Sequence, residues 1–233
     1  MYFDSVSIAA MARRDRAAFV NSLSGFKSAN LVGTADARGH TNLAIMSSAV
    51  HLGSHPPLLA LVVRPGGDER HTLSNLLDSG CYTLNHVTPD IVEAAHQTAA
   101  RYDREVSEFE ATGLTPQWLD DFGAPFVAEA GVKLGMVLRE HQQLAINATH
   151  LVIGEVVRVM LPQGCLADDG AVDLVRAGSV ALCGLDTYLH PAPLIRMAYA
   201  KPDLPPRQVS KVDKVSTPGP AGEPFIQTGD AIA

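Results

Sequence analysis

Cysteine is scarce in this sequence, with Cys81, Cys165 and Cys183 the only three among 233 residues. An odd number of widely spaced cysteines fits neither a disulfide framework nor a thiolate metal site. A chain of this length buries roughly 70% of its unfolded surface, so it needs no cross-link to fold. Cys81 and Cys183 lie in strand-like runs, where we expect them to be small buried hydrophobes.

Long apolar runs and blocks of like charge are also missing. No apolar run reaches the ~18 residues of a membrane span. Near the N-terminus, Asp4 precedes a short apolar stretch and the basic cluster follows it, which is the reverse of a signal peptide. The formal net charge of −7 disfavours nucleic-acid binding and attraction to anionic membranes. We therefore expect a cytoplasmic protein without nucleic-acid or membrane partners.

Several well-known site motifs are absent. Neither G-x-G-x-x-G nor G-x-x-x-x-G-K-[ST] occurs, which disfavours a Rossmann or P-loop nucleotide site. Ser47 lacks the flanking glycines of a hydrolase nucleophile elbow. His51 and His55 stand four residues apart, as in a helical metal pair, but the two prolines that follow force extended backbone on His55. We therefore expect no metal site.

What the chain does contain is a series of short strands with helices between them. Apolar residues at helical spacing predict a helix over about 11–24. Thr88 followed by Pro89 predicts a second helix start, and Gly80 predicts the end of a short helix that begins near Thr72. The expected strands are 29–36, 41–45, 56–64, 81–87, 131–146, 149–162 and 179–189.

This order of elements predicts a mainly β fold. Short strands joined by hairpins, with helices inserted at intervals, favour an antiparallel barrel over a βαβ array. We expect one domain over 1–200, with an irregular helical excursion over about 103–126. The segment 201–233 holds six of the fifteen prolines and its charges cancel, so it cannot build a core. It is expected to be a flexible tail or an arm that lies on a neighbour.

Polar groups gather at predicted strand and helix ends between residues 42 and 72. Ser47 and Ser48 follow one strand, and Arg64 ends the next with a fork of donors suited to phosphate oxygens. Thr72 opens a short helix, whose N-terminal N–H groups attract anions. The backbone over 42–46 could line a flat ring system. Together these features predict an anionic cofactor.

Each of these residues also has a simpler interpretation. Thr72 is often only a helix cap, and an arginine such as Arg64 is often only a partner in a surface ion pair. Arg70 and His71, just before the helix, add positive potential under either interpretation. Spacing alone leaves both interpretations open.

Five separated blocks of the sequence carry a family resemblance. They read "SGFKSANLVGTADARGHTNLAIMSSAVHLGSHPPLLALVVRP", "ERHTLSNLLDSGCYTLNHV", "AAHQTAARYDREVSEFEATGL", "THLVIGEVVRV" and "CGLDTYLHPAPLIRMAYAKP". Their type and order, from about Asn21 to Pro202, resemble the flavin reductase-like family. The resemblance implies an FMN-binding split β-barrel of antiparallel Greek-key type with peripheral helices, which forms homodimers with the flavin near the subunit interface. FMN is the implied cofactor, with FAD as an alternative, and NAD(P)H is the implied reductant.

The resemblance also implies which residues hold the flavin. The segment from Asn42 to Ser48 cradles the ring and the phosphate, and Arg64 and Thr72 contact the phosphate. The helix start and turn of the block "AAHQTAARYD" approach the ring. With flavin as the redox group, we expect no catalytic nucleophile and no obligatory side-chain acid or base. The implied contacts are Asn42, Leu43, Ala44, Ile45, Met46, Ser47, Ser48, Arg64, His71, Thr72, His96, Thr98 and Arg101.

One departure from the family pattern affects the reductant. Short two-component reductases carry a Gly-Asp-His stretch whose His lies near the nicotinamide, whereas this chain reads "INATHLVIGEV". Thr149 aligns with that His, and His150 is shifted by one residue, which on a strand turns its side chain to the other face. The first hypothesis is an NAD(P)H-dependent reductase serving a small acceptor or a downstream oxygenase. The second is an FMN-binding electron-transfer or sensor module, and the third is a structural dimer without a cofactor.

Overall fold

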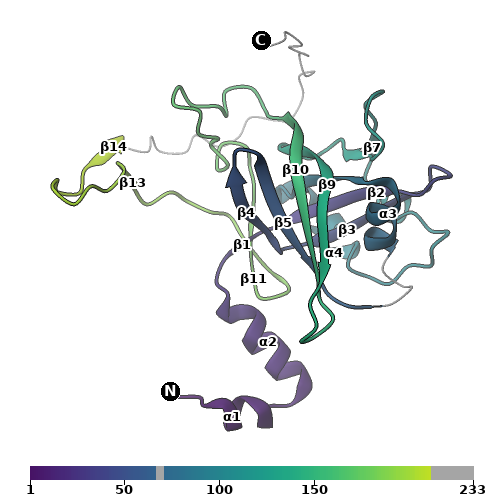
Figure 1. Cartoon of the computed structure of the whole chain (residues 1–233), viewed down its shortest axis with the longest axis horizontal. Helices are drawn as coiled ribbons and strands as arrows, with labels where there is room; N and C mark the ends of the chain where they lie inside the picture. Colours follow the sequence, from purple (N-terminus) through teal and green to yellow (C-terminus); the bar gives the residue numbers. More distant parts are fainter. Residues whose placement is uncertain (67–70, 211–233) are drawn as a thin grey trace.

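The computed structural model describes residues 1–66 and 71–210, and it is dominated by one antiparallel sheet (Figure 1). The strand order is β3-β2-β6-β9-β10-β5-β4. The predicted mainly β fold is therefore confirmed. The strands of this sheet are β2 Asn30–Ala35, β3 Thr41–Met46, β4 Ala49–Ser54, β5 Pro57–Val63, β6 Cys81–His86, β9 Lys133–Gln143 and β10 His150–Met160.

The two end strands of this sheet, β3 and β4, are consecutive in the chain, and only Ser47 and Ser48 join them. The Val62 N–H donates to the Ser48 carbonyl over 3.3 Å, and the Ser48 hydroxyl donates to the Val62 carbonyl over 2.6 Å. A sheet whose first and last strands are a dipeptide apart must curl round on itself. The sheet is therefore an antiparallel barrel, closed near the Ser47–Ser48 bend.

The barrel interior is filled by aliphatic side chains around Tyr82, which is fully buried. Tyr82 lies against Gly154 of β10, where an added Cβ would stand 2.2 Å from the tyrosine hydroxyl oxygen. Glycine is therefore required at this position, because any side chain would collide with the ring. The other buried members of this cluster are Val32, Leu61, Val63, Leu73, Leu76, Leu84, Met136 and Val152.

Helix α3, His71–Ser79, packs on the barrel strands with Thr72, Leu73, Asn75 and Leu76 buried. Gly80 follows it with a φ of 72°, the left-handed conformation that commonly ends a helix. The helix predicted from Thr72 to Gly80 is thus confirmed.

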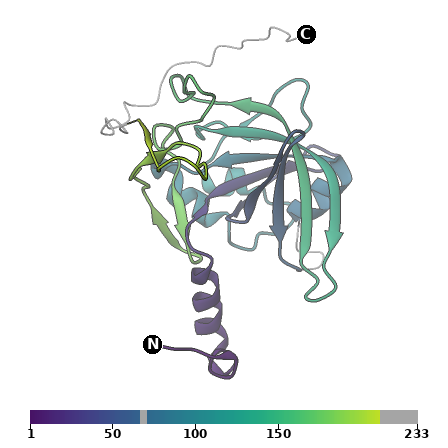
Figure 2. The same ribbon diagram turned by 60° about the vertical axis from the view of Figure 1, so that its left-hand side comes forward.

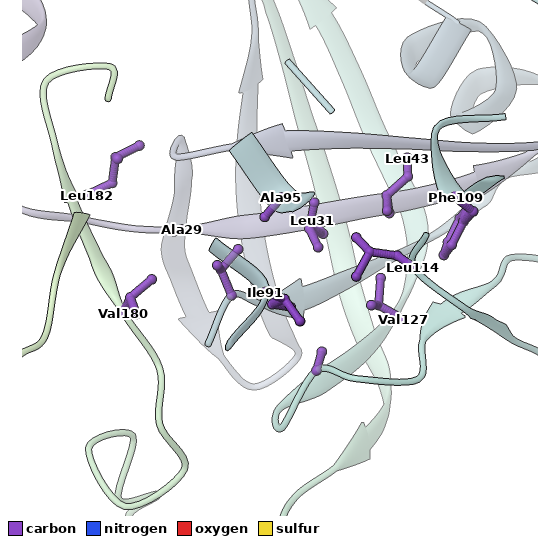
Figure 3. Close-up of a cluster of buried hydrophobic side chains, with 12 residues drawn as sticks. Ala29, Leu31, Leu43, Ile91, Ala95, Phe109, Leu114, Val127, Val180 and Leu182 are labelled. Atoms are coloured by element: carbon purple, nitrogen blue, oxygen red, sulfur yellow. The ribbon is translucent and has the colours of Figure 1, made fainter. Parts of the chain in front are cut away.

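A second buried cluster joins the outer face of β2 and β3 to the helical segments (Figure 3). These segments are the 3₁₀ turn η2 Pro89–Ile91, α4 Val92–Gln97 and α5 Glu108–Thr112. Leu31 and Leu43 from the sheet meet Ile91, Phe109 and other apolar side chains there. Because these contacts are buried, α4 and α5 are held firmly against β3.

Smaller elements surround the barrel. Helices α1 and α2 precede it, and β1, β11 and β12 form a three-stranded sheet beside it. None of the helices in the described part of the chain is long and apolar enough to cross a bilayer. The bounds are α1 Ser5–Ala10, α2 Arg13–Leu23, β1 Lys27–Ser28, β7 Pro116–Gln117, β8 Phe126–Val127, β11 Ala181–Cys183, β12 Thr187–Leu189, β13 Arg196–Met197 and β14 Gln208–Ser210.

Two sequence expectations differ from the structure in detail. The helix start predicted at Thr88 and Pro89 is found, but its first turn is the 3₁₀ turn η2, and α4 then ends at Gln97. The Thr98 hydroxyl donates back to the Ala95 carbonyl over 2.7 Å and accepts the Ile45 N–H over 2.9 Å. Its side chain thus competes with continued helix at this point. The helix expected over 11–24 is found as α2, although none of its residues is buried.

All three cysteines are free, with Cys165 buried and the other two half-buried. Strand β14 pairs with β13, so a hairpin crosses the expected boundary at Ala200. The division into a domain and a tail stays a prediction, and residues 211–233 of that tail lie outside the described residues.

Candidate functional site

Strand β3 has side chains from α5 and from the turn after α4 along the edge that faces away from β2. The Leu43 N–H donates to Glu108 Oε2 over 2.9 Å, and the Ile45 N–H donates to the Thr98 hydroxyl, also over 2.9 Å. These two backbone donors are therefore engaged within the chain. Ser47 makes no hydrogen bond within the described residues, so the polar groups left for a ligand lie at the bend after β3.

The first turn of α3 is tied to the barrel by buried amides. The Asn42 Nδ2 donates to the Thr72 hydroxyl over 3.1 Å, and the Asn75 Nδ2 donates to the Thr34 hydroxyl over 3.3 Å. Since the Thr72 oxygen accepts from Asn42, its own O–H remains to be donated elsewhere. Thr72 is the second residue of α3 rather than the residue that precedes the helix, which weighs against a purely capping role.

Arg64 directly follows β5 and is exposed. It makes no hydrogen bond or ion pair with any residue in 1–66 or 71–210. Nothing in this part of the chain therefore supports the interpretation of Arg64 as a partner in a surface ion pair. The Ser48–Val62 contacts lie two residues before it. The segment from Asn42 to Ser48 thus touches the start of α3 at one end and the end of β5 at the other. Arg70 lies outside the described residues.

His71 and Glu108 form the electrostatic surroundings of β3. Glu108 is buried, and burial raises its pKa, opposed by the hydrogen bond from the Leu43 N–H and by the nearby His71. A small polar pocket lies beside them, where Arg104 Nη2 donates to Asn75 Oδ1 over 3.2 Å. The pocket is lined by Asp36, His40, Thr41, Asn42, His71, Asn75, Arg104 and Val106.

The residues predicted near the ring from 96 to 101 separate into two kinds. Thr98 is buried, and its hydroxyl is bonded to Ala95 and Ile45. It therefore positions β3 through a hydrogen bond to the strand backbone. His96 is exposed, and its Nδ1 lies 3.0 Å from the Tyr188 hydroxyl of β12. The two rings meet edge to face, with centroids 5.8 Å apart. Arg101 is exposed on the following turn.

Sequence reasoning missed Glu108 and Tyr188. Each acts across a long separation, of 65 residues to Leu43 and of 92 residues to His96. Glu108 lies in the irregular stretch after residue 103, and Tyr188 lies in a three-residue strand. Neither position has a local pattern that marks a site, and only the fold brings these side chains to β3 and α4.

Thr149 and His150, where this chain departs from the pattern of short flavin reductases, lie at the start of β10. Thr149 is buried. His150, the first residue of β10, pairs with Val63 of β5. Its Nδ1 lies 2.8 Å from the Nε2 of His141, and the two rings are stacked with centroids 5.1 Å apart. His150 is thus held by a second histidine. Across residues 1–66 and 71–210, no group of three or more His, Cys, Asp or Glu side chains is placed to hold a metal ion.

Comparison with known proteins gives concordant results. A profile of the flavin reductase like domain matches residues 23–174. A split barrel domain protein of Shewanella frigidimarina, provisionally assigned as a flavin reductase, is 52% identical, with a TM-score of 0.83 over 86% of this chain and all of the other. Nitrilotriacetate monooxygenase component B of Bacillus cereus is 21% identical, with a TM-score of 0.74 over 84% and 98% of the two chains. An FMN-binding protein of Thermus thermophilus is 20% identical, with a TM-score of 0.59 over 76% and 90%.

Proposed function

Because the chain belongs to the flavin reductase-like family, we propose that it binds FMN and moves electrons between NAD(P)H and the flavin or a small acceptor. The observation that carries the proposal is the Asn42–Thr72 hydrogen bond, which joins β3 to the first turn of α3. Exposed Arg64 at the end of β5 completes the donor set. FAD is the alternative cofactor.

The donor set suits a phosphate group. α3 presents the positive end of its dipole, and Thr72 keeps a hydroxyl proton to donate. Arg64 adds a guanidinium that suits phosphate oxygens in geometry and charge, and His71 adds a further donor. Residues of these types, at a strand end and a helix start, support an anionic ligand more strongly than an apolar one.

The remaining proposed contacts would hold the ring. The segment Asn42–Ser48 lies between the two proposed phosphate-binding elements. At its bend Ser47 is available to a ligand, whereas the Ser48 hydroxyl and carbonyl are bonded to Val62. His96 and Arg101 stand on the helical side, while Thr98 and Glu108 keep β3 in place. When bound, flavin supplies the hydride and electron chemistry. The part of these residues is to orient the ring and to set the polarity around it.

A second candidate function is an FMN-binding electron-transfer or sensor module without nicotinamide turnover. The specific observation in its favour is Thr149, which is buried at the position where short reductases carry a histidine. His150 does not simply replace that histidine, because His141 already engages its Nδ1. A site without a nicotinamide partner is consistent with these two facts.

Two measurements test both candidates. The absorbance spectrum of purified protein, before and after added FMN, tests flavin binding, and mass spectrometry identifies what is released. Anaerobic mixing of the FMN-loaded protein with NADH or NADPH then separates the two functions. Rapid bleaching of the flavin band supports the reductase, and persistent colour supports the electron-transfer or sensor module. A protein that neither carries nor binds flavin would be the structural dimer without a cofactor.

The proposal extends to partners and place of action. Homodimers with the flavin near the subunit interface, in the cytoplasm, are the arrangement that the family resemblance and the sequence composition support. Component B of nitrilotriacetate monooxygenase shares the fold, so an oxygenase that consumes reduced flavin is a reasonable downstream partner. Co-purification with an oxygenase encoded nearby would test that partner directly.

A further inference from the structure

His96 of α4 and Tyr188 of β12 form a hydrogen-bonded pair of titratable side chains. His96 Nδ1 lies 3.0 Å from the Tyr188 hydroxyl, and the two rings meet at an interplanar angle of 82°. His96 is exposed and Tyr188 is half-buried. A hydrogen bond at such a place adds little to stability, because water can replace either partner. The pair is therefore a candidate for chemistry as well as for structure.

The pair lies beside the strand that is proposed to hold the ring. Thr98, two residues after His96, accepts the Ile45 N–H over 2.9 Å. Tyr188 and Ile45 both pack, half-buried, against the cluster of Figure 3, to which Ala95 also belongs. The three-stranded sheet that carries Tyr188 stands beside the barrel (Figures 1 and 2). Residues 92 apart in sequence thus bring a phenol and an imidazole to the end of α4 that is bonded to β3.

The direction of the hydrogen bond decides what the phenol can do. A neutral imidazole has one N–H and one acceptor nitrogen, and a phenol hydroxyl can both donate and accept. With its N–H on Nδ1, His96 donates to the Tyr188 oxygen, and the Tyr188 O–H is left for a ligand. Among residues 1–66 and 71–210 this hydroxyl makes no other hydrogen bond. The Nε2 of His96 is on an exposed ring, where it can exchange protons with water.

Tyr188 is a neutral phenol at physiological pH. Burial raises the pKa of its hydroxyl above the ordinary value of 10, and the nearby carboxylate of Asp186 raises this pKa further. The hydroxyl therefore keeps its proton in the resting protein and can donate it to an oxygen that gains negative charge.

We propose that Tyr188 donates a proton to a small conjugated carbonyl compound that accepts electrons at this site, and that His96 positions the Tyr188 hydroxyl. The inference rests on the proposed function, because NAD(P)H and the flavin supply the hydride. The acceptor gains that hydride at its β-carbon and the Tyr188 proton at its carbonyl oxygen, and the enol so formed rearranges in water to the saturated carbonyl compound. Water restores the Tyr188 proton through the exposed Nε2 of His96. In total, NAD(P)H loses a hydride, and the acceptor gains one hydride and one proton.

The chemistry of the pair indicates this class of acceptor. A carbonyl oxygen gains negative charge when a hydride reaches the conjugated carbon, and a placed proton donor lowers the barrier of such a step. An acceptor that takes up single electrons has no need of the donor. The absence of an obligatory acid or base that the sequence predicts concerns hydride transfer to the flavin, whereas Tyr188 acts in the transfer to the acceptor.

The experiment follows the transfer to the acceptor in a single turnover. The full chain is loaded with FMN, reduced by one equivalent of dithionite without oxygen, and mixed with cinnamaldehyde, so that NADH and NADPH take no part. Tyr188→Phe should slow flavin reoxidation and the formation of hydrocinnamaldehyde by about 10²-fold or more. Tyr102→Phe is the matched control and should leave both rates unchanged. Its hydroxyl accepts from Gln97 Nε2 over 3.0 Å, one residue along the same helix.

Binding gives a readout that does not depend on turnover. 4-Chlorophenolate presents an oxygen acceptor but cannot be reduced by the flavin. Calorimetry should show that Tyr188→Phe weakens its binding to the FMN-loaded protein by about tenfold or more, and that Tyr102→Phe does not.

The part of His96 is tested by rescue. His96→Leu removes the nitrogen that faces Tyr188 and should slow the single turnover. His96→Asn places an amide N–H close to the position of Nδ1 and should restore most of the rate. A failure of His96→Asn to exceed His96→Leu would contradict the positioning role.

The other results decide between this proposal and its alternatives. If Tyr188→Phe matches Tyr102→Phe in rate and in binding of 4-chlorophenolate, the pair takes no part in the chemistry. If Tyr188→Phe is then also less stable in urea, the pair only joins β12 to α4. A wild type that binds FMN but does not reduce cinnamaldehyde shows that the acceptor is not a conjugated carbonyl compound. A wild type that binds no FMN overturns the proposed function itself, so that FMN titration distinguishes the two failures.

Discussion

Asn42 of β3 and Thr72 of α3, thirty residues apart in sequence, are joined by a buried hydrogen bond of 3.1 Å. The bond fixes the first turn of α3 against the strand whose outer edge is held by Glu108 and Thr98. Three elements far apart in sequence are therefore positioned by side-chain bonds to one strand. The proposed phosphate site, formed by Arg64 and the first turn of α3, depends on this arrangement. If the start of α3 could shift, its N–H groups would not point to a fixed phosphate position.

Replacing Arg64 with alanine should weaken FMN binding. The side chain is exposed and has no described partner, so its loss should leave the fold intact while removing a charge-assisted hydrogen bond of about 1.5–3 kcal/mol. That corresponds to roughly 10- to 150-fold in Kd. Fluorescence titration with FMN measures the change, and Arg38→Ala on the β2–β3 turn is the matched control. If Arg64→Ala and Arg38→Ala bind FMN with equal affinity, Arg64 does not contact the phosphate.

Thr72→Val should reduce both stability and FMN affinity. Valine keeps the shape of threonine but leaves the buried Asn42 amide without its acceptor, which costs about 1–3 kcal/mol of unfolding free energy. Thr72→Ser keeps the hydroxyl and should bind FMN nearly as wild type does. Urea unfolding and FMN titration separate the two effects. A loss of stability with unchanged affinity in Thr72→Val would make Thr72 purely structural.

The barrel was more predictable from the sequence than the site. Alternating and continuous apolar runs locate β2, β5, β6, β9 and β10, and Gly80 marks the end of α3, because these signals are local. The start of the helix at Thr88 was predicted, but its end was not, since the Thr98 hydroxyl bonds to Ile45 of a distant strand. Glu108 and Tyr188 were missed for the same reason. Their partners lie 65 and 92 residues away, where no spacing rule reaches.

The pH dependence of stability should report on Glu108. Burial raises the pKa of this carboxyl in the folded chain above its value in the unfolded chain. The folded state therefore favours the protonated form, and the contribution of Glu108 to stability is full below the unfolded pKa and is lost as pH rises through the folded pKa. Glu108→Gln retains an acceptor for the Leu43 N–H and removes the charge. We expect the stability of Glu108→Gln relative to wild type to increase as pH rises above the ordinary carboxyl value of 4.5, measured by urea unfolding. A constant difference above this value would contradict the assignment.

Tyr82 and Gly154 give a test of the barrel interior. The Tyr82 hydroxyl is buried without a hydrogen-bond partner among the described residues, and burial raises its pKa. Because an unpaired buried hydroxyl costs about 1–3 kcal/mol, Tyr82→Phe should be neutral or stabilising in urea unfolding. Gly154→Ala should cost about 1–3 kcal/mol, since its Cβ would meet the hydroxyl oxygen at 2.2 Å.

The control for the glycine is Gly53→Ala, where the nearest atom to an added Cβ is 3.4 Å away. Because the Tyr82 hydroxyl is the closest obstacle at Gly154, the Tyr82→Phe/Gly154→Ala double variant should recover part of the loss. The coupling between these two touching sites is then measurable from the four proteins. Two results would contradict this account of the packing: destabilisation by Tyr82→Phe alone, which means that a buried water pairs the hydroxyl, or strict additivity in the double variant.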